Sequence, residues 1–239
     1  MHETRLHDAL RETLHTLHNA AARAQRPVPR LLAVSKTHPA TAVAALGAAW
    51  RGLEPGVRPA FGENYVQEAA QKQAELAGAD FEWHLIGHLQ SNKAREAARL
   101  FDWVQTVDRP RLVEALSRHR VAAAPPLNVL VQVNIDDEAS KHGCMPDAVE
   151  ALADAIRAQP RLRLRGLMAI PAPDPATRGR AFQRMQALFS ALQARHPGVD
   201  TLSMGMSDDF AEAVGAGATL VRIGSALFGA RPASSPPRG

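Results

Sequence analysis

The sequence predicts a single parallel β/α barrel, the (β/α)8 or TIM-barrel fold. Eight short apolar or β-prone runs follow one another along 239 residues, and helix-like stretches separate most of them. Alternation of this kind predicts a parallel sheet with helices packed on its outside. A closed eight-stranded barrel typically needs about 250 residues, which is close to the length of this chain. No internal stretch has the composition of a linker, so we expect one domain over residues 1–231.

The expected strands are short, apolar and bounded by turn residues. In chain order they cover residues 31–35, 59–63, 81–87, 103–107, 127–135, 162–170, 201–204 and 219–223. Apolar spacing near 3.6 residues predicts helices between them, among others at 66–77, 110–120, 146–158 and 177–195. One extra helix, at about 3–23, precedes the first strand.

The ends of two segments carry local signals. Asp108 is expected to cap the helix that has Pro110 just inside its start. Residues 232–239 are rich in Pro and Ser, so we expect a flexible C-terminal tail there. An open doubly wound sheet is the competing fold, but its Gly-rich dinucleotide turn is missing, because Lys36, Thr37 and His38 follow the first strand.

Composition limits the classes of partner. The net charge is +4 and the sequence pI is about 9.8, yet the arginines are spread along the chain and aromatic residues make up only 5%. This pattern does not favour nucleic acid as a partner. Cys144 is the only cysteine, which excludes an intramolecular disulfide. The polar N-terminus and the lack of a long apolar run predict a cytoplasmic protein without a membrane partner.

Lys36 directly follows the first expected strand and is one of four lysines in a chain with 24 arginines. Arginine cannot lose its proton in a protein, whereas a desolvated lysine can. A neutral lysine amine attacks an aldehyde and forms a Schiff base. Taken alone, this segment is explained more simply by a lysine that reaches water from a strand end. The rest of the chain favours the Schiff base.

The active site of a β/α barrel lies at the carboxyl ends of its strands, and phosphate often binds at the loops after strands seven and eight. Small residues and hydroxyls suit such a site, because backbone N–H groups can then approach the phosphate oxygens. Those two loops contain Ser203, Gly205, Ser207, Gly224 and Ser225. Glycine and serine are also common in ordinary turns, so either loop alone is weak evidence.

A lysine opposite a phosphate-binding loop suits a ligand with both a carbonyl and a phosphate. Pyridoxal 5′-phosphate (PLP) has both, and a PLP-binding protein also offers a partner for the pyridine nitrogen. Arg222, at the end of the eighth expected strand, is the candidate for that partner. Its alternative role is that of a salt-bridged arginine at a strand end.

Six segments carry a family resemblance, and they follow in order over about residues 5–231. They are AVSK (33–36), FGENY (61–65), WHLIGHLQ (83–90), GLMAI (166–170), LSMGMSDD (202–209) and RIGSALFG (222–229). In these segments the chain resembles the pyridoxal phosphate homeostasis proteins, the YggS/PROSC family. The resemblance implies an alanine-racemase-like barrel with an extra N-terminal helix, and a role in PLP supply and amino-acid balance.

The resemblance also implies a set of site residues. PLP is expected on Lys36, its phosphate at Ser207, Gly224 and Ser225 with backbone help from Met206, and its pyridine nitrogen opposite Arg222. With three further residues of the matching segments, the expected cofactor-binding set is Lys36, Asn64, His84, Ser203, Met206, Ser207, Arg222, Gly224 and Ser225. No catalytic residue is assigned. A zinc site at His84 and His88 is not expected either, because the Glu and the helix of H-E-x-x-H are missing.

Three functions compete. A carrier or regulator of intracellular PLP, with no robust turnover, is the leading one. A cationic Arg222 would disfavour protonation of the pyridine nitrogen, and racemases of this fold use a second base, a tyrosine from a C-terminal β-domain. The only tyrosine here is Tyr65, and the chain ends soon after the eighth strand. A weak PLP-dependent racemase and a class I aldolase are the alternatives. Apo PLP enzymes are possible acceptors, and a monomer is expected.

Overall fold

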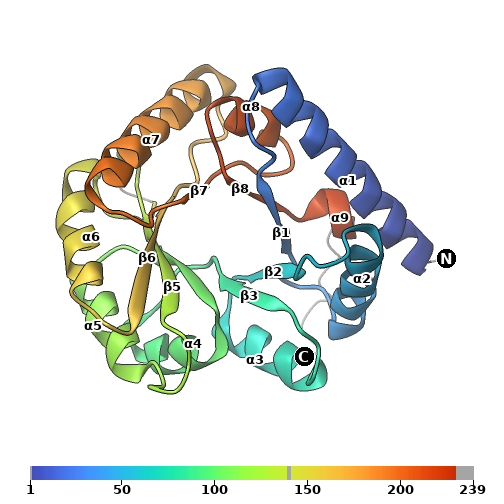
Figure 1. The fold of residues 1–239 in the computed structure, drawn as a ribbon, viewed down its shortest axis with the longest axis horizontal. Helices are drawn as coiled ribbons and strands as arrows, with labels where there is room; N and C mark the ends of the chain where they lie inside the picture. The colour runs from blue at the N-terminus through green and yellow to red at the C-terminus, as the bar shows by residue number, and fades with distance from the viewer. Residues whose placement is uncertain (1, 139–140, 230–239) are drawn as a thin grey trace, which may run out of the picture.

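Eight parallel strands close into a barrel in the order β1 to β8, in a computed structural model that describes residues 2–138 and 141–229 (Figure 1). The strands are β1 (Arg30–Val34), β2 (Ala60–Glu63), β3 (Glu82–Leu85), β4 (Trp103–Val107), β5 (Leu127–Gln132), β6 (Leu162–Met168), β7 (Thr201–Ser203) and β8 (Leu220–Ile223). Pairing of β8 with β1 completes the ring and sets Arg222 opposite Leu32. The predicted barrel is therefore confirmed.

Each strand begins within one residue of its predicted start, but several end earlier than predicted. The segments expected at 81–87, 127–135 and 162–170 stop at Leu85, Gln132 and Met168. The apolar residues beyond these ends, such as Ile135 and Ala169, are still buried. They cover the mouth of the barrel as loops, so a continuous apolar run overstates the length of the strand.

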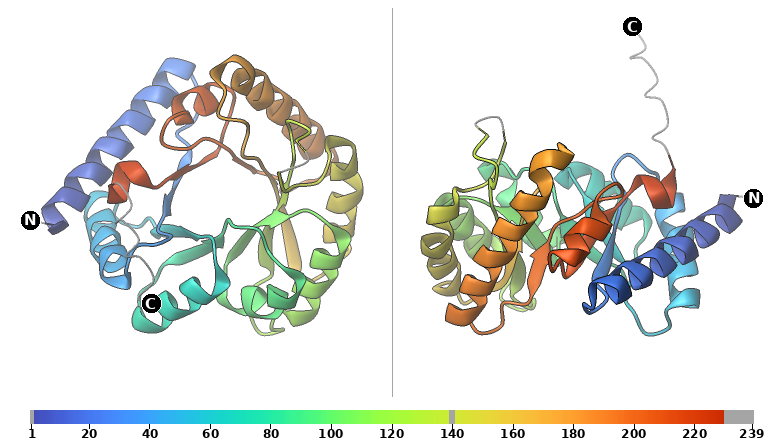
Figure 2. Two further views of the ribbon diagram at one scale, coloured as in Figure 1. Left: turned by 180° about the vertical axis from the view of Figure 1, so that it is seen from behind. Right: turned by 90° about the horizontal axis from the view of Figure 1, so that it is seen from above.

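Helices surround the barrel on its outer side (Figures 1 and 2). They are α1 (His2–Ala24), α2 (Ala40–Leu53), α3 (Val66–Glu75), α4 (Ala94–Leu100), α5 (Pro110–His119), α6 (Val149–Arg157), α7 (Pro175–Arg195), α8 (Phe210–Gly215) and α9 (Ser225–Phe228). Short 3₁₀ turns, η1 (Ser91–Lys93) and η2 (Pro146–Ala148), precede α4 and α6. The extra helix α1 buries Leu6, Leu10 and Leu17, and it packs against α2, α8 and α9.

The predicted cap of α5 is wrong. Arg109 is the N-cap residue and makes no side-chain capping bond, although Pro110 does occupy the first turn. The Asp108 carboxylate instead accepts a hydrogen bond from Arg109 Nη1 at 2.6 Å. The predicted tail, 232–239, lies outside the described residues. No helix of the described chain is long and apolar enough to cross a bilayer.

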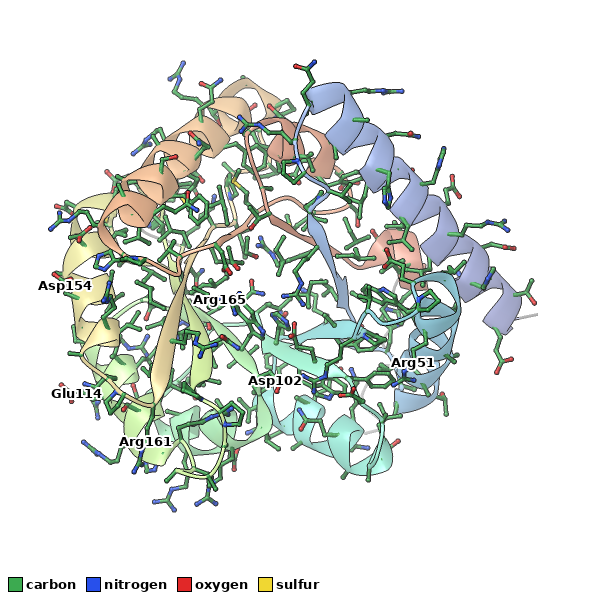
Figure 3. The ribbon with its side chains drawn as sticks, viewed as in Figure 1. Arg51, Asp102, Glu114, Asp154, Arg161 and Arg165 are labelled. Carbon is green, nitrogen blue, oxygen red and sulfur yellow. The ribbon has the colours of Figure 1, made fainter. Side chains whose placement is uncertain are left out.

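The main apolar core lies between the strands and the helices, and two small apolar clusters are separate from it. One contains Leu32, Ala60 and Leu220, and the other contains Trp103, Leu130 and Met168. Inward and outward residues alternate along barrel strands, so these clusters fill the inside of the barrel. The guanidinium groups of Arg30, at the start of β1, and Arg165, in the middle of β6, lie 5.9 and 4.6 Å from the centroid of the Trp103 ring. Figure 3 labels Arg165 inside the ring of strands.

Candidate ligand-binding site

A cavity of about 300 Å³ opens at the carboxyl ends of β1, β7 and β8. Its lining comprises Val34, Lys36, His38, Met206, Ser207, Asp208, Arg222, Gly224, Ser225 and Gly229. Six of the nine residues expected from the sequence are among them: Lys36, Met206, Ser207, Arg222, Gly224 and Ser225. Its size lies at the lower end of the range typical of small-molecule sites.

The turn that carries Lys36 has a strained backbone. Thr37, the next residue, has a φ of +67°, which β-branched residues rarely adopt. Its backbone N–H donates a hydrogen bond to Glu68 Oε1 at 2.5 Å. On the other side of Lys36, Ser35 Oγ donates to Glu63 Oε1 at 2.6 Å. Strain of this kind persists only where neighbouring contacts enforce it, and here it sets the direction in which Lys36 leaves β1.

Lys72, on α3, joins these contacts into one buried cluster. Its ammonium lies 2.7 Å from both Glu63 Oε1 and Glu68 Oε1, and it donates to the Ser35 carbonyl at 2.7 Å. The side chains of Lys72 and Glu63 are 6% and 0% exposed. Burial raises the pKa of Glu63, although the hydrogen bonds from Lys72 and Ser35 oppose the rise. An ammonium held between two carboxylates is a structural cation rather than a nucleophile.

Lys93 and Lys141 each lie close to a carboxylate outside the cavity. Lys93 lies 3.5 Å from Glu96, and Lys141 lies 2.7 Å from Asp136. Among the lysines, which all lie in the described part of the chain, Lys36 is the one that lines the cavity. The position predicted from the sequence is thus the one that can meet a ligand there.

The loops after β7 and β8 bring two hydroxyls together across the cavity. Ser225 Oγ and Ser207 Oγ are 3.1 Å apart. Gly205 has a φ of +93°, and a Cβ there would lie 2.6 Å from Ala213 Cβ, so the turn after β7 requires glycine. Met206 lines the cavity, but its backbone N–H donates to Asp209 Oδ1 at 2.6 Å. The backbone N–H of Met206, which was expected to help bind the phosphate, therefore already donates a hydrogen bond within the protein.

Arg222 enters the cavity from the barrel interior and is 3% exposed. Nη1 donates to Ser203 Oγ at 2.7 Å, and Nη2 donates to the Ala169 carbonyl at 2.9 Å. Burial lowers the pKa of Arg222 to about 10, so it stays cationic at neutral pH. A guanidinium has five N–H donors, and the two bonds described here fix its plane without using them all.

Arg222 is the first member of a buried hydrogen-bond chain through the barrel. Ser203 Oγ donates to Gln105 Oε1 at 2.7 Å, and Gln105 Nε2 lies 2.9 Å from His84 Nδ1. His84 Nε2 lies 2.7 Å from Glu82 Oε1, which also accepts from Arg30 at 2.6 Å. Because Gln105 Oε1 accepts from the serine, its Nε2 donates to His84, whose Nδ1 therefore accepts. We call this Arg222–Ser203–Gln105–His84–Glu82 chain the relay.

Three of the nine expected residues, Asn64, His84 and Ser203, do not line the cavity. His84 is fully buried, stacks on Trp103 at 5.1 Å between ring centroids, and does not line the cavity. Ser203 is also fully buried and touches Arg222 instead. Asn64 follows β2 and likewise does not line the cavity, although its backbone would meet a Cβ at Gly87. Strand position alone did not show whether these side chains point into the barrel or towards its mouth.

Charge within the relay favours a neutral His84. Burial lowers the pKa of His84, although its hydrogen bond with Glu82 opposes that shift. Burial alone would raise the pKa of Glu82, but the His84 hydrogen bond and the Arg30 guanidinium outweigh it and lower that pKa to about 2. In the unfolded chain both groups have higher pKa values and bind protons more readily. Folding stability should therefore fall as the pH drops below 6.5, first through His84 and then, below 4.5, through Glu82.

His84→Asn should weaken this pH dependence. At pH 7 the substitution should lower the free energy of unfolding by about 1–3 kcal/mol, because Gln105 and Glu82 lose their buried hydrogen bonds with His84. Between pH 6.5 and 5 its melting temperature should fall less than that of the parent protein. Thermal unfolding followed by circular dichroism measures both effects, with His15→Asn, on the exposed face of α1, as the matched control. Parallel pH curves for the parent and His84→Asn would contradict a neutral buried His84.

Comparisons with known proteins show which proteins this chain resembles. The family model of the alanine racemase N-terminal domain matches residues 7–232. A pyridoxal phosphate homeostasis protein of Pseudomonas aeruginosa is 54% identical over 208 residues, 86% of each chain, and one of Escherichia coli K12 is 50% identical over 206 residues, 84% of this chain and 85% of the relative. The structure of PipY from Synechococcus elongatus, with PLP bound, is 36% identical over 94% of this chain and all of that one, with a TM-score of 0.76.

Proposed function

Because this chain belongs to the pyridoxal phosphate homeostasis proteins, which share the barrel of the alanine racemase N-terminal domain, we propose that it binds PLP and acts as a carrier or regulator of PLP supply. The observation that carries the proposal is the cavity itself. Among the described residues, its polar lining comprises one lysine, one buried arginine, two serine hydroxyls and His38, with a single carboxylate, that of Asp208. Such a donor set suits an anionic ligand that has a carbonyl group.

The lysine, the arginine and the two serines of the cavity each have a proposed role. PLP supplies an aldehyde, with which a lysine amine forms a Schiff base, and Lys36 is the amine in this cavity. The hydroxyls of Ser207 and Ser225, with the small Gly224 between strand and helix, hold the phosphate. Arg222 faces the pyridine nitrogen. His84 and Ser203 act through the relay and position Arg222 without touching the ligand.

Arg222 supports binding rather than turnover. At neutral pH its guanidinium only donates hydrogen bonds, so it favours an unprotonated pyridine nitrogen. An unprotonated ring is a poorer electron sink, and the carbanion chemistry of PLP enzymes is then less favoured. We expect a cytoplasmic monomer that passes PLP to apo-enzymes. A slow PLP-dependent racemase is the second candidate, because the family model that matches this chain is that of the alanine racemase N-terminal domain.

Two assays separate the carrier from the enzyme. The PLP-loaded protein is mixed with single L-amino acids in deuterated water, and loss of the α-proton signal is followed by NMR. The carrier proposal predicts no exchange at enzymatic rates. It also predicts that the loaded protein restores activity to an apo PLP enzyme, while an equal amount of Lys36→Ala does not. Rapid α-proton exchange without any transfer would favour the racemase.

Ser207→Ala and Gly224→Val should weaken PLP retention much more than folding. Ser207→Ala removes one proposed phosphate donor, a loss of about 1–3 kcal/mol in binding for a hydrogen bond to a charged group. At Gly224 the φ is −118° and a Cβ would lie 3.4 Å from Val34, so a Cβ fits there, and the two methyl groups of valine would narrow the cavity. Equilibrium dialysis of PLP and thermal melts test this, with the exposed Ser190→Ala as control. Equal losses of binding and stability would indicate a structural role.

A further inference from the structure

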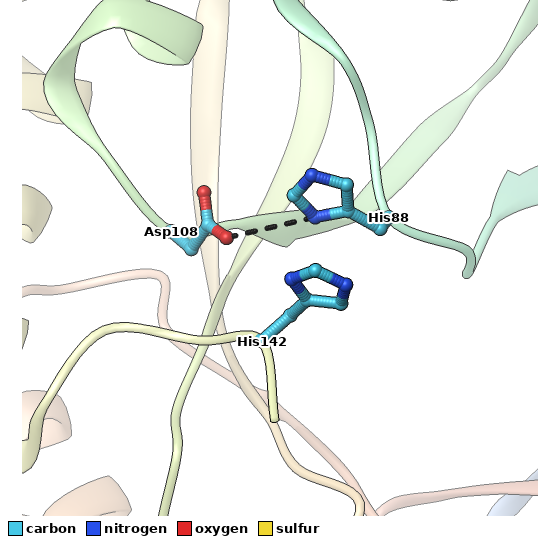
Figure 4. A group of neighbouring side chains, drawn as sticks. All are labelled: His88, Asp108 and His142. Atoms are coloured by element: carbon cyan, nitrogen blue, oxygen red, sulfur yellow. Dashed lines mark ion pairs between the residues drawn. The ribbon is translucent and has the colours of Figure 1, made fainter. Parts of the chain in front are cut away.

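We infer that His88, Asp108 and His142 form a binding site for a divalent transition metal such as Zn²⁺ at the barrel mouth. His88 follows β3, Asp108 follows β4 directly, and His142 lies in the segment after β5 (Figure 4). Each residue offers one ligand atom, and the three atoms lie within 4.8 Å of one another. We call this group the histidine triad.

The histidine triad is separate from the cavity of Lys36. The cavity belongs to the ends of β1, β7 and β8, whereas the triad belongs to the ends of β3, β4 and β5. In a closed barrel of this order the two groups of strands are on opposite sides of the ring. The carboxyl face, where barrels place their functional sites, thus has a second group of ligand-type side chains.

The types of ligand select the class of metal. Two imidazoles and one carboxylate suit Zn²⁺, Co²⁺, Ni²⁺ or Fe²⁺, whereas Mg²⁺ and Ca²⁺ prefer oxygen ligands throughout. The rings of His88 and His142 are stacked with their centroids 3.8 Å apart and an angle of 15° between their planes. Three protein ligands leave a position for water, as in catalytic zinc sites.

Asp108 is already oriented for this role. Its Oδ1 accepts a hydrogen bond from Arg109 Nη1 at 2.6 Å, and Arg109 Nη2 is held by the Leu89 carbonyl at 2.9 Å. Its Oδ2 faces His88 Nδ1 at 3.9 Å (Figure 4). One oxygen is thus fixed by a neighbour outside the triad, and the other points to the histidines, which is the arrangement that orients metal-binding carboxylates.

The triad must rearrange to bind a metal, because a metal lies in the plane of each imidazole that binds it, and two nearly parallel rings 3.8 Å apart cannot share one. Two ligand atoms bound to zinc at about 2.0–2.1 Å in a tetrahedron are about 3.4 Å apart. His88 and His142 lie on exposed loop positions, so their rings can turn to close the remaining distance. The cost is the proximity of Arg109, whose charge opposes that of the metal.

A second group of possible ligands, Glu150, Asp154 and His196, is less suitable. Arg195 Nε lies 3.0 Å from Glu150 Oε1, and Arg157 Nη1 lies 3.4 Å from His196 Nδ1. His196 Nε2 is itself 2.8 Å from Glu150 Oε1. Two arginines and an internal ion pair therefore already use the groups that a metal would need.

Cobalt titration of the full-length protein tests the histidine triad. After treatment with a chelator and desalting, Co²⁺ is added while its visible d–d absorbance is followed, and Zn²⁺ is then used as a competitor. The parent protein should show one saturable site. His88→Ala and His142→Ala should each weaken binding by roughly tenfold or more, and the double variant should lose the site. The matched control is His15→Ala/His18→Ala, which removes two exposed histidines of α1.

Each other outcome overturns the inference. Absence of a saturable site in the parent protein would do so, and so would equal affinity in the parent and the His88→Ala/His142→Ala variant. Loss of the site in Glu150→Gln/His196→Ala, with retention in the triad variants, would place the metal elsewhere. The titration is repeated in Lys36→Ala, because PLP itself can chelate metals. The triad predicts unchanged cobalt binding there, so the test does not depend on the proposed PLP site.

Discussion

Lys36→Ala is expected to abolish covalent PLP binding while leaving the fold almost unchanged. Lys36 is partly exposed in the cavity lining, whereas the contacts that hold its turn come from neighbours such as Lys72 and Glu68. The visible absorbance that a Schiff base between PLP and lysine gives the loaded protein should disappear. PLP retention after dialysis should fall by about two orders of magnitude or more, because only non-covalent contacts remain.

The stability of Lys36→Ala serves as the internal check. A change at a partly exposed position away from the core should alter the free energy of unfolding by about 0.5 kcal/mol or less. Lys141→Ala, which removes a lysine outside the cavity, should keep both absorbance and retention. Undiminished visible absorbance in Lys36→Ala would show that PLP binds through another group.

Lys72→Met is expected to have the opposite profile, with a large loss of stability. Methionine has a similar length but leaves the carboxylates of Glu63 and Glu68 without their cation, and Glu63 is fully buried. Removing one partner of a buried ion pair costs about 3–5 kcal/mol. The turn that carries Lys36 also loses its contact with Ser35, so PLP retention should fall as a second consequence.

Urea unfolding measures the effect of Lys72→Met, and Lys93→Met is its matched control. The Lys93 ammonium is 3.5 Å from Glu96, and the two side chains are 34% and 52% exposed, so its loss should cost less than about 1 kcal/mol. The midpoint for Lys72→Met should fall with an unchanged slope. If both variants had the same midpoint, the Lys72 cluster would not contribute to the stability of the barrel as described.

The sequence predicts the strands well because each is a local pattern. A short apolar run bounded by turn residues fixes where a strand begins, and the alternation with helices fixes its class. The strand ends are predicted less well, since apolar residues such as Ile135 stay buried in loops beyond the last ladder pair. Lys36 could be found for the same reason, because its strand and its loop are adjacent in sequence.

The relay and the Lys72 cluster could not be predicted, because they depend on closure of the barrel. Gln105 and Ser203 are 98 residues apart and belong to different strands. No property of either segment indicates that their side chains meet. Lys72 lies in an amphipathic helix where a lysine is normally solvated. Its burial follows from the place of α3 beside the end of β1, which only the three-dimensional arrangement shows.

The central claim is that Lys36 holds PLP, and reductive trapping tests it most directly. The PLP-loaded protein is reduced with borohydride, digested, and mapped by mass spectrometry. The account predicts a pyridoxyl modification on the peptide that contains Lys36, at close to one equivalent, and none on the peptides of Lys72, Lys93 or Lys141. A modification on one of those lysines instead, or no modification after incubation with excess PLP, would contradict it.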